Sequence, residues 1–399
     1  MKILMLAQNF IRFRDDIMSP FLFNWVSEIN KNKDFEVIVL APHEKGLKEY
    51  EVIGGVKIYR FRYASDKYER IAYKNNMHEL VIKNTFNKLI FLKLIRNFYK
   101  KIIEIVQKEK IDIIHANWWV PCGIAAYLAF KKTKVPYIVT THGTDVFILR
   151  KFKFFSFFAR KIFKNAAKVN AVSNYVAKIV TDLLKINKNK IAVFPMPFDR
   201  NKFYPVKKGR NKIKTIFTMG KLVKRKGVNY LVDACSILKD KKIDFKLIIV
   251  GKGPEEESLK EQIKNLNLEK NITIIPSVPH KELVKYYNDA DVFVLASITD
   301  WKGETEAFGV VFAEALACKT PVIGTRTGGI PDVVIDGKTG ILVEEKNPKQ
   351  LADALIKILK NEKLAKKLAE NGYKYVHENF TAEKIAGKTI KVYNEVVSR

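Results

Sequence analysis

Acidic residues, cysteine and long apolar runs are all scarce in this chain. Asp and Glu number 42 against 72 Lys and Arg, so the formal net charge is +30 over 399 residues. This imbalance favours partners that carry anionic groups, such as phosphorylated small molecules, nucleic acid or anionic lipid. The three cysteines, Cys122, Cys235 and Cys318, lie too far apart for a zinc motif and cannot all pair with one another. We therefore expect reduced, buried thiols.

No stretch reaches the roughly 18 apolar residues that a membrane-spanning helix needs. The apolar run at the N-terminus ends at Gln8 and Asn9 and is too short for a signal peptide. These features predict a cytoplasmic protein. At roughly 100–200 residues per domain, a chain of this length is expected to form two domains.

Short β-branched runs alternate with longer amphipathic segments along most of the chain. Strands are expected at 2–7, 35–41, 111–116, 137–141, 169–172, 214–219, 245–250, 271–275, 292–296, 321–324 and 340–343, and helices at 20–30, 122–132, from 174 onward, 228–239, 254–265 and 382–397. This alternation predicts an α/β fold with parallel sheets covered by helices on both faces. Pro195 and Pro197 predict a linker between two doubly wound, Rossmann-like domains, at 1–195 and 200–378. Such sheets bind ligands beyond the carboxyl ends of their strands, so the expected site is the cleft across which the domains face.

The first candidate motif runs from 305 to 316, after the expected strand at 292–296. Gly309 is expected to open a helix whose free N–H groups and positive dipole end attract an anion such as a diphosphate. Glu306 precedes this helix and can bind sugar hydroxyls, while Glu314 within it can bind both hydroxyls of a ribose. The competing interpretation is that both are solvated surface residues, but their apolar neighbours favour a binding role.

A second candidate motif, from Met219 to Gly227, follows the first strand of the second domain. Lys221 and Lys226 can converge on a leaving diphosphate and neutralise its developing charge. Arg225 fits this role less well. A run of basic residues is often a solvated face, but the position after a strand favours phosphate binding here.

A third candidate motif, from Thr141 to Asp145, ends a strand of the first domain. His142 is expected to face the cleft, where it can bond the sugar or the reacting centre, and Asp145 to orient the loop. Gly143 permits the tight turn. A histidine after a strand is often structural instead, and this is the interpretation for His115.

Two glycine clusters have other interpretations. Gly328 and Gly329 form a turn that either borders the donor or only reverses the chain. The segment at 251–254 follows a strand and opens a helix, as a dinucleotide-binding fingerprint would, but Glu256 occupies the third glycine position. This departure argues against NAD binding and favours a structural turn.

The three motifs, with their order and spacing along the chain, resemble glycosyltransferase family 4, a retaining family with the two-domain GT-B fold. The resemblance covers most of the chain. It implies a glycosyltransferase that moves a sugar from a nucleotide diphosphate sugar to an acceptor and needs no metal ion or cofactor. It also implies that the terminal helix at 379–399 crosses back to the N-terminal, acceptor-binding domain.

The resemblance further implies roles for single residues. Lys221 and Lys226 would hold the diphosphate, Glu314 the ribose, Glu306 the sugar near its anomeric carbon, and His142 the sugar from the opposite domain. His142, Glu306 and Lys226 are thus the implied catalytic set. The implied donor-binding set is Gly220, Lys221, Lys226, Glu306, Ala307, Phe308, Gly309, Val310 and Glu314. Further candidates are Asp145, Asn9, Gly328 and Gly329.

The chain departs from the family pattern at three points. Lys221 stands where Arg is more usual, which keeps the charge but removes bidentate geometry. Ala307 replaces a glycine, so the backbone there is less free to adopt a positive φ. The loop from Gln8 to Arg14 lacks the usual glycine pair. Because that loop often meets donor and acceptor, the resemblance does not extend to the acceptor class.

The segment from Arg150 to Lys164 mixes basic residues with six phenylalanines, and no acidic residue occurs between Asp145 and Asp182. Such a helix is typical of an anionic membrane interface, which would place the protein at the inner face of a membrane and fit a lipid-linked or cell-surface glycan precursor as acceptor. A core-packed helix with a basic outer face is the alternative. The stretch from Lys83 to Lys101 is also basic and acid-free, and would extend the same surface.

Two other classes of function stay open at this stage. The charge suits a nucleic-acid-binding protein, but no known module is visible, so no nucleic acid partner is expected. A sugar phosphorylase or nucleotide-sugar epimerase could use the same fold, because fold does not determine function.

Overall fold

The computed structural model describes residues 1–14, 16, 18–73, 77–151, 153–206, 213–301 and 303–398. Phe152 of the basic aromatic segment and Arg399 of the expected terminal helix lie outside this description. The chain forms two compact units. Unit 1 comprises Met1–Pro197 and Ala382–Arg399, and unit 2 comprises Phe198–Thr381. Among the described residues, no helix combines the length and the apolar character that crossing a membrane requires.

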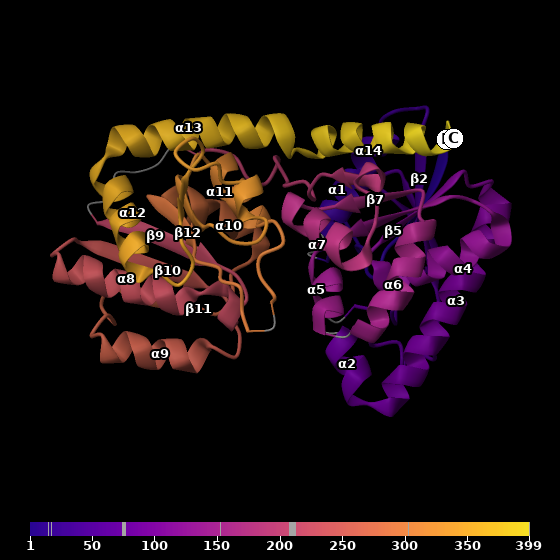
Figure 1. Cartoon of the computed structure of the whole chain (residues 1–399), viewed down its shortest axis with the longest axis horizontal. Helices are drawn as coiled ribbons and strands as arrows, with labels where there is room; N and C mark the ends of the chain where they lie inside the picture. Colours follow the sequence, from indigo (N-terminus) through magenta and orange to yellow (C-terminus); the bar gives the residue numbers. More distant parts are fainter. Residues whose placement is uncertain are drawn as a thin grey trace. The chain divides into compact units, whose positions relative to one another are not determined.

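Unit 1 is built on a sheet with the strand order β3-β4-β2-β1-β5-β6-β7-β8. Its strands are β1 (Lys2–Leu6), β2 (Glu36–Pro42), β3 (Tyr50–Ile53), β4 (Val56–Phe61), β5 (Ile113–Asn117), β6 (Tyr137–Thr141), β7 (Lys168–Ala171) and β8 (Ile191–Val193). Its helices are α1 (Pro20–Asn30), α2 (Met77–Lys83), α3 (Thr85–Glu109), α4 (Ile124–Thr133), α5 (Thr144–Lys151), α6 (Lys153–Asn165), α7 (Asn174–Leu184) and α14 (Ala382–Val397). They cover the sheet as Figure 1 shows.

One edge of this sheet is an antiparallel hairpin of β3 and β4. Its two-residue turn is Gly54-Gly55, with φ values of 55° and 82°, and two positive φ values are what a tight hairpin turn of this kind requires. The predicted parallel arrangement therefore does not extend to this edge. The remaining neighbours in the sheet are parallel.

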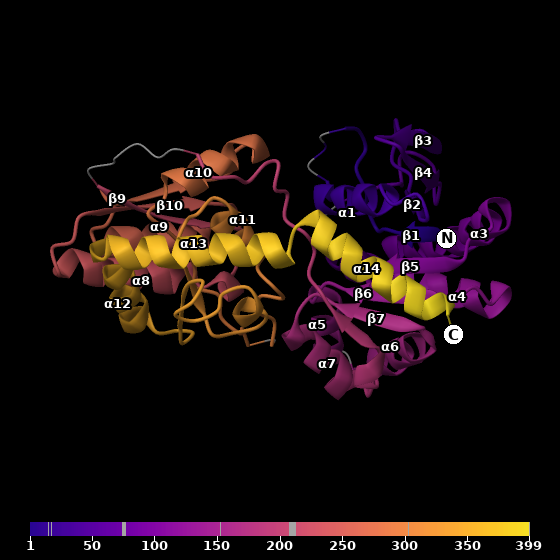
Figure 2. The same ribbon diagram turned by 90° about the horizontal axis from the view of Figure 1, so that it is seen from above.

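The terminal helix α14 belongs to unit 1, where it packs against α1. Figures 1 and 2 both show the two helices side by side. Across the contact with α1, Trp25 Nε1 donates to Thr389 Oγ1 at 3.0 Å, and α14 also reaches β5, where the Tyr393 hydroxyl bonds His115 Nδ1 at 2.7 Å. The end of the chain thus completes the core of the N-terminal unit.

Unit 2 is built on a parallel sheet with the strand order β11-β10-β9-β12-β13-β14. Its strands are β9 (Lys214–Met219), β10 (Phe245–Val250), β11 (Ile272–Ile275), β12 (Val292–Leu295), β13 (Val322–Thr325) and β14 (Ile341–Val343). Its helices are α8 (Val228–Asp240), α9 (Glu256–Asn265), α10 (Leu283–Asp289), α11 (Val310–Ala317), α12 (Pro348–Lys360) and α13 (Glu362–Asn379). In Figure 2 the long α13 lies beside α11.

The expected elements occur within two residues of their predicted bounds, and two of the helices begin two residues late. The helix expected from 122 starts at Ile124, because the turn at Trp119–Gly123 before it is not regular helix: Val120 has extended backbone angles of φ −127° and ψ 126°. The helix expected from 254 starts at Glu256, after a turn in which the Glu256 N–H donates to the Gly253 carbonyl. Both delays occur beside proline, which suits a turn better than a helix interior.

Each sheet has one point where the strand order reverses. In unit 1 the chain winds outward from β1 in one direction and from β5 in the other, and in unit 2 the same happens at β9 and β12. Ligands of open α/β sheets bind beyond the carboxyl ends of the two strands at such a reversal. The loops after β9 and β12, and those after β1 and β5, are therefore the places to examine.

Candidate active site

The loop after β9 is held in place by backbone contacts that only glycine allows. Gly227 has φ 61°, and a Cβ there would lie 1.9 Å from the Ala296 carbonyl oxygen at the end of β12. A Cβ on Gly251 would lie 1.9 Å from the Gly220 carbonyl oxygen, and one on Gly253 would lie 2.1 Å from that of Leu222. The glycine segment at 251–254 thus supports the lysine-bearing loop.

Lys226 and Glu306 meet where these loops converge. Lys226 Nζ lies 2.5 Å from Glu306 Oε2, and the two side chains are only 14% and 13% exposed. Burial tends to raise the pKa of Glu306, but the charge and hydrogen bond of Lys226, helped by Arg225, hold that pKa below its ordinary value. Glu306 is therefore an ionised, nearly buried carboxylate beside a buried ammonium group.

The glycine pair Gly328-Gly329 holds the backbone of Glu306. The Gly329 N–H donates to the Glu306 carbonyl at 2.9 Å, and a Cβ on Gly328, which has φ 57°, would lie 2.1 Å from that oxygen. Nearby, the hydroxyls of Thr305 and Thr327 lie 3.3 Å apart. These contacts give the pair a role in positioning Glu306, which the sequence did not predict. That this turn borders the donor stays a prediction.

The helix α11 begins directly after this loop. Gly309, its N-cap residue, has φ 89°, and Val310 is the first helical residue. Because Gly309 has no side chain, it cannot cap the first N–H groups of the helix, which leaves them for an anion. Phe308 is buried against Phe380, and Ala307 does not adopt a positive φ. The loop therefore tolerates alanine where the family usually has glycine.

Glu314, on α11, belongs to a second polar cluster, which lies near the end of β9. The Tyr287 hydroxyl donates to Glu314 Oε2 at 2.8 Å and lies 3.1 Å from the sulfur of Met219. Burial raises the pKa of Glu314 to about 7, although the Tyr287 hydrogen bond opposes this effect. The Glu314 carboxyl group is thus poised between its two protonation states near neutral pH.

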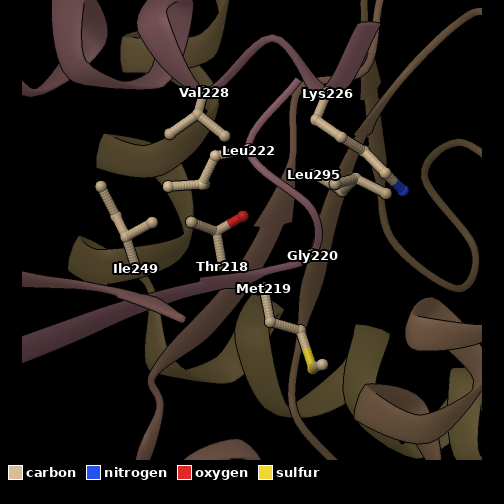
Figure 3. A pocket seen from close by; sticks show the side chains of 8 residues that line it. All are labelled: Thr218, Met219, Gly220, Leu222, Lys226, Val228, Ile249 and Leu295. Atoms are coloured by element: carbon tan, nitrogen blue, oxygen red, sulfur yellow. The ribbon is translucent and has the colours of Figure 1, made fainter. Parts of the chain in front are cut away.

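The structure places the other sequence candidates of unit 2 unequally. Figure 3 shows Gly220 at the end of β9 and the Lys226 ammonium group pointing away from the apolar side chains of Leu222 and Val228. Lys221, by contrast, is exposed. Lys226 is therefore positioned by the fold, whereas Lys221 is a solvent-facing cation on the same loop.

We predict that Glu314→Gln removes a pH dependence of stability. With a pKa near 7 in the folded protein against an ordinary value of 4.5, Glu314 binds its proton more tightly when folded. The stabilisation of the folded state by this proton is complete below pH 4.5 and is lost as the pH rises to about 7, with an upper value of about 3 kcal/mol. The melting temperature of the variant should therefore rise relative to that of the wild type between pH 5 and pH 8. An unchanged difference would contradict a raised pKa.

In unit 1, His142 is held between an aromatic ring and polar groups. Its ring stacks on Trp118 with centroids 3.9 Å apart, and its Nε2 lies 3.3 Å from Asn117 Oδ1. The His142 backbone N–H donates to Asp145 Oδ1 at 3.0 Å, so Asp145 orients this loop. Burial lowers the pKa of His142 to about 3, with a further effect of His115, and burial raises the pKa of Asp145 to about 6. His142 is therefore a neutral imidazole at physiological pH.

Two other candidates of unit 1 have local partners. Asn9 Oδ1 accepts a hydrogen bond from the Ser19 hydroxyl at 2.5 Å. Both ring nitrogens of the buried His115 are bonded, Nδ1 to Tyr393 and Nε2 to the Thr140 hydroxyl at 2.7 Å. His115 thus has the structural role that the sequence favoured.

One cluster in the described part of the chain has ligand types suited to a metal ion, namely His43, Asp66 and Glu69. His43 Nδ1 already lies 2.5 Å from Glu69 Oε2, and its Nε2 lies 2.8 Å from the Leu47 carbonyl oxygen. Asp66 pairs with Arg62. Because the protein's own groups satisfy these side chains, nothing in this cluster points to a metal ion.

Family models match both halves of the chain. Residues 199–375 match glycosyl transferases group 1, and residues 22–202 match Glycosyltransferase Family 4. An uncharacterized glycosyltransferase of Methanocaldococcus jannaschii is 31% identical over 298 residues, which cover 73% of this chain and 78% of that relative. The chain belongs to the family-4 glycosyltransferases. Its resemblance to this family, and its expected class as a transferase, are thereby confirmed.

Solved structures establish the fold of this glycosyltransferase. The sucrose-phosphate synthase of Thermosynechococcus elongatus has a TM-score of 0.79 at 20% identity and covers 100% of this chain and 99% of its own. Anabaena HepE, in complex with UDP and glucose, has a TM-score of 0.70 at 17% identity, with 99% of each chain covered. The expected GT-B fold with two Rossmann-like domains is confirmed.

Sequence reasoning missed three polar or aromatic residues of this glycosyltransferase that contact its candidate site residues. Tyr287 bonds Glu314 from α10, a helix without a recognised motif. Asn117 and Trp118 contact His142 from the end of β5. The last two follow a strand at the reversal of the sheet order, so their position could have revealed them. Tyr287 gave no such signal.

Proposed function

We propose that this glycosyltransferase transfers a sugar from a nucleotide diphosphate sugar with retention of anomeric configuration. The observation that carries the proposal is the buried Lys226–Glu306 pair at the reversal of the unit 2 sheet. It supplies a cation for phosphate and an ionised carboxylate for hydroxyls within one short contact. The similar fold of Anabaena HepE, solved with UDP and glucose, supports a nucleotide sugar as donor.

In this proposal the diphosphate binds at the start of α11, near Gly309, and takes Lys226 as a counter-charge. Lys221 adds a second positive charge from the exposed part of the loop. Glu306, relieved of its lysine, accepts hydrogen bonds from the sugar hydroxyls, and Glu314 accepts those of the ribose. No metal ion is then needed, because protein cations neutralise the leaving group.

Retention follows if the acceptor hydroxyl attacks from the face that the diphosphate leaves. The bond from the anomeric carbon to the diphosphate oxygen breaks, a bond to the acceptor oxygen forms, and the acceptor proton passes to the departing phosphate. Neutral His142, stacked on Trp118, is proposed to contact the donor sugar as a hydrogen-bonding group rather than as a cation.

A panel of nucleotide sugars in EDTA tests this proposal. The matching donor is expected to raise the melting temperature, because ligand at 100 times its Kd stabilises the folded state by about 2.7 kcal/mol. Adding Mg²⁺ should change the shift little. Proton NMR of the product with a simple acceptor should then show the anomeric configuration of the donor. A shift that needs the metal ion, or an inverted product, would contradict the proposal.

We also propose that α6 rests on an anionic membrane surface. Phe154, Phe155, Phe157 and Phe158 are exposed by 74%, 50%, 70% and 49%, so the alternative of a fully core-packed aromatic face fails for these four side chains. The surrounding lysines and arginines complement anionic lipid head groups, at roughly 1 kcal/mol for each cation near the surface. Such a surface suits an acceptor that is linked to lipid.

Replacing both Phe154 and Phe157 by serine is expected to weaken vesicle binding at least tenfold. Each change removes an exposed aromatic side chain whose burial in the lipid interface is worth about 1.5–3 kcal/mol. Sedimentation with phosphatidylglycerol vesicles measures the effect, and Val52→Ser, an exposed apolar residue of β3, serves as control. Equal binding of both variants would assign the membrane contact elsewhere.

A further inference from the structure

An open groove of about 560 Å³ lies in unit 1 between α3 and the chain that follows β4. Its volume falls in the range of small-ligand sites, roughly 300–1,000 Å³. Most of its lining is apolar, and includes Ala64, Tyr68, Phe86, Leu89, Ile90 and Leu92. The groove is therefore large enough for part of a hydrocarbon chain and chemically suited to one.

The walls of the groove are connected, yet their apolar side chains stay uncovered. The rings of Tyr68 and Phe86 meet edge to face with centroids 5.0 Å apart, and Asn97 Nδ2 donates to the Arg62 carbonyl at 2.9 Å. Leu89 and Leu92 are nevertheless 56% and 62% exposed. Adjacent exposed apolar side chains of this kind mark a binding surface more often than an isolated one does.

The charge around the groove selects an anionic occupant. Lys93 and Arg96 line it, both are exposed, and neither has an acidic partner in the described part of the chain. No lining residue is acidic, and α3 has no acid before Glu104. The neighbouring Asp66 is paired with Arg62. An unpaired lysine and arginine beside an apolar trough complement a phosphate attached to a hydrocarbon chain.

The topology places the groove toward the side of the unit 1 sheet where the carboxyl ends of its parallel strands lie. Ala64 and Tyr68 follow the carboxyl end of β4, and α3 leads from that edge back to the start of β5. The half of α3 that lines the groove is its N-terminal half. His142 leaves the carboxyl end of β6, which runs parallel to β5. The groove and His142 thus lie toward the same edge of one sheet.

We propose that this groove holds the hydrocarbon chain of an acceptor that is linked to a lipid phosphate, with Lys93 and Arg96 binding the phosphate. The inference rests on the proposed glycosyl transfer for the word acceptor, but not for the binding itself. It specifies a single lipid molecule rather than a bilayer as the occupant. The exposed phenylalanines of α6 do not line this groove.

Calorimetric titration with decyl phosphate below its micelle concentration tests the proposal without any nucleotide sugar. Saturable binding is expected, and octyl phosphate should bind about fifteenfold more weakly, because it lacks two methylenes and each buried methylene is worth roughly fourfold in affinity. Leu89→Glu should weaken decyl phosphate at least tenfold, while Leu128→Glu, an exposed apolar position on α4 outside the groove, should not. Arg96→Gln should weaken it severalfold, and Lys100→Gln, one turn further along α3, should not.

Four results would overturn the assignment. Equal effects of Leu89→Glu and Leu128→Glu would show that the ligand does not bind in the groove. Binding of inorganic phosphate as tight as that of decyl phosphate would show that the hydrocarbon chain does not contribute to binding. Binding of decyltrimethylammonium as tight as that of decyl phosphate would show that Lys93 and Arg96 do not form a phosphate site. Binding to phosphatidylglycerol vesicles without binding to monomeric decyl phosphate would make this a bilayer contact. If decyl phosphate does not bind, the proposal of donor binding in EDTA is unaffected. If no nucleotide sugar binds, the titration with decyl phosphate still tests the groove.

Discussion

Replacing Lys226 by methionine is expected to slow sugar transfer by about 10²- to 10³-fold, the effect of removing one preorganised group that meets developing charge. Methionine keeps much of the apolar stem but has no ammonium group for the diphosphate. It also leaves Glu306 nearly buried without its 2.5 Å partner, so the pKa of Glu306 should rise. Steady-state rates with saturating donor measure the loss.

Lys224→Met provides the matched control for this experiment. Lys224 belongs to the same short 3-10 turn at Lys224–Lys226, carries the same charge and is exposed. If general basicity of the loop were enough, the two variants would lose the same activity. A large loss only at Lys226 supports the buried pair as the phosphate contact, and equal activity of both variants would refute it.

Gly227→Ala is expected to destabilise unit 2 by about 2–5 kcal/mol. Part of this is the roughly 1–2 kcal/mol that a side chain adds at φ 61°, and the rest, about 1–3 kcal/mol, comes from crowding. The crowding is specific, because the new Cβ would lie 1.9 Å from the Ala296 carbonyl oxygen at the end of the neighbouring strand. Calorimetric unfolding of the full chain should show a lowered transition.

Gly337→Ala separates the two contributions. Gly337 also has a positive φ, 70°, but a Cβ there meets nothing within 4 Å. This variant should therefore show only the conformational cost of about 1–2 kcal/mol. If Gly227→Ala were no more damaging than Gly337→Ala, the close approach of the loops after β9 and β12 would not be a constraint on the fold.

Local signals in the sequence were sufficient to predict those helices and strands whose hydrophobic pattern and flanking turn residues indicate the same bounds. The helices α1 and α14 and the strands β6, β9 and β10 have the predicted bounds. Their hydrophobic periodicity and flanking turn residues point to the same limits. The hairpin of β3 and β4 was missed although Gly54-Gly55 between β-branched residues is a recognisable turn signal.

The candidate site was predictable only in part, because sequence motifs name residues and not their partners. The motifs identified Lys226 and Glu306, but their separation of 80 positions gave no measure of the short ion pair. Tyr287 bonds Glu314 through the packing of α10, which no local pattern encodes. The role of Gly328 in supporting Glu306 likewise depends on a contact that only the folded sheet creates.

The position of α14 in the chain has a consequence for synthesis. Unit 2 is one continuous segment and has all its residues once position 381 has left the ribosome, whereas Trp25 and His115 wait for Thr389 and Tyr393, which are made after it. The first-made half of the protein thus acquires its final shape only after the whole of unit 2 has been made. A stop codon in place of Ala382 would leave this early half unfinished while sparing the later one.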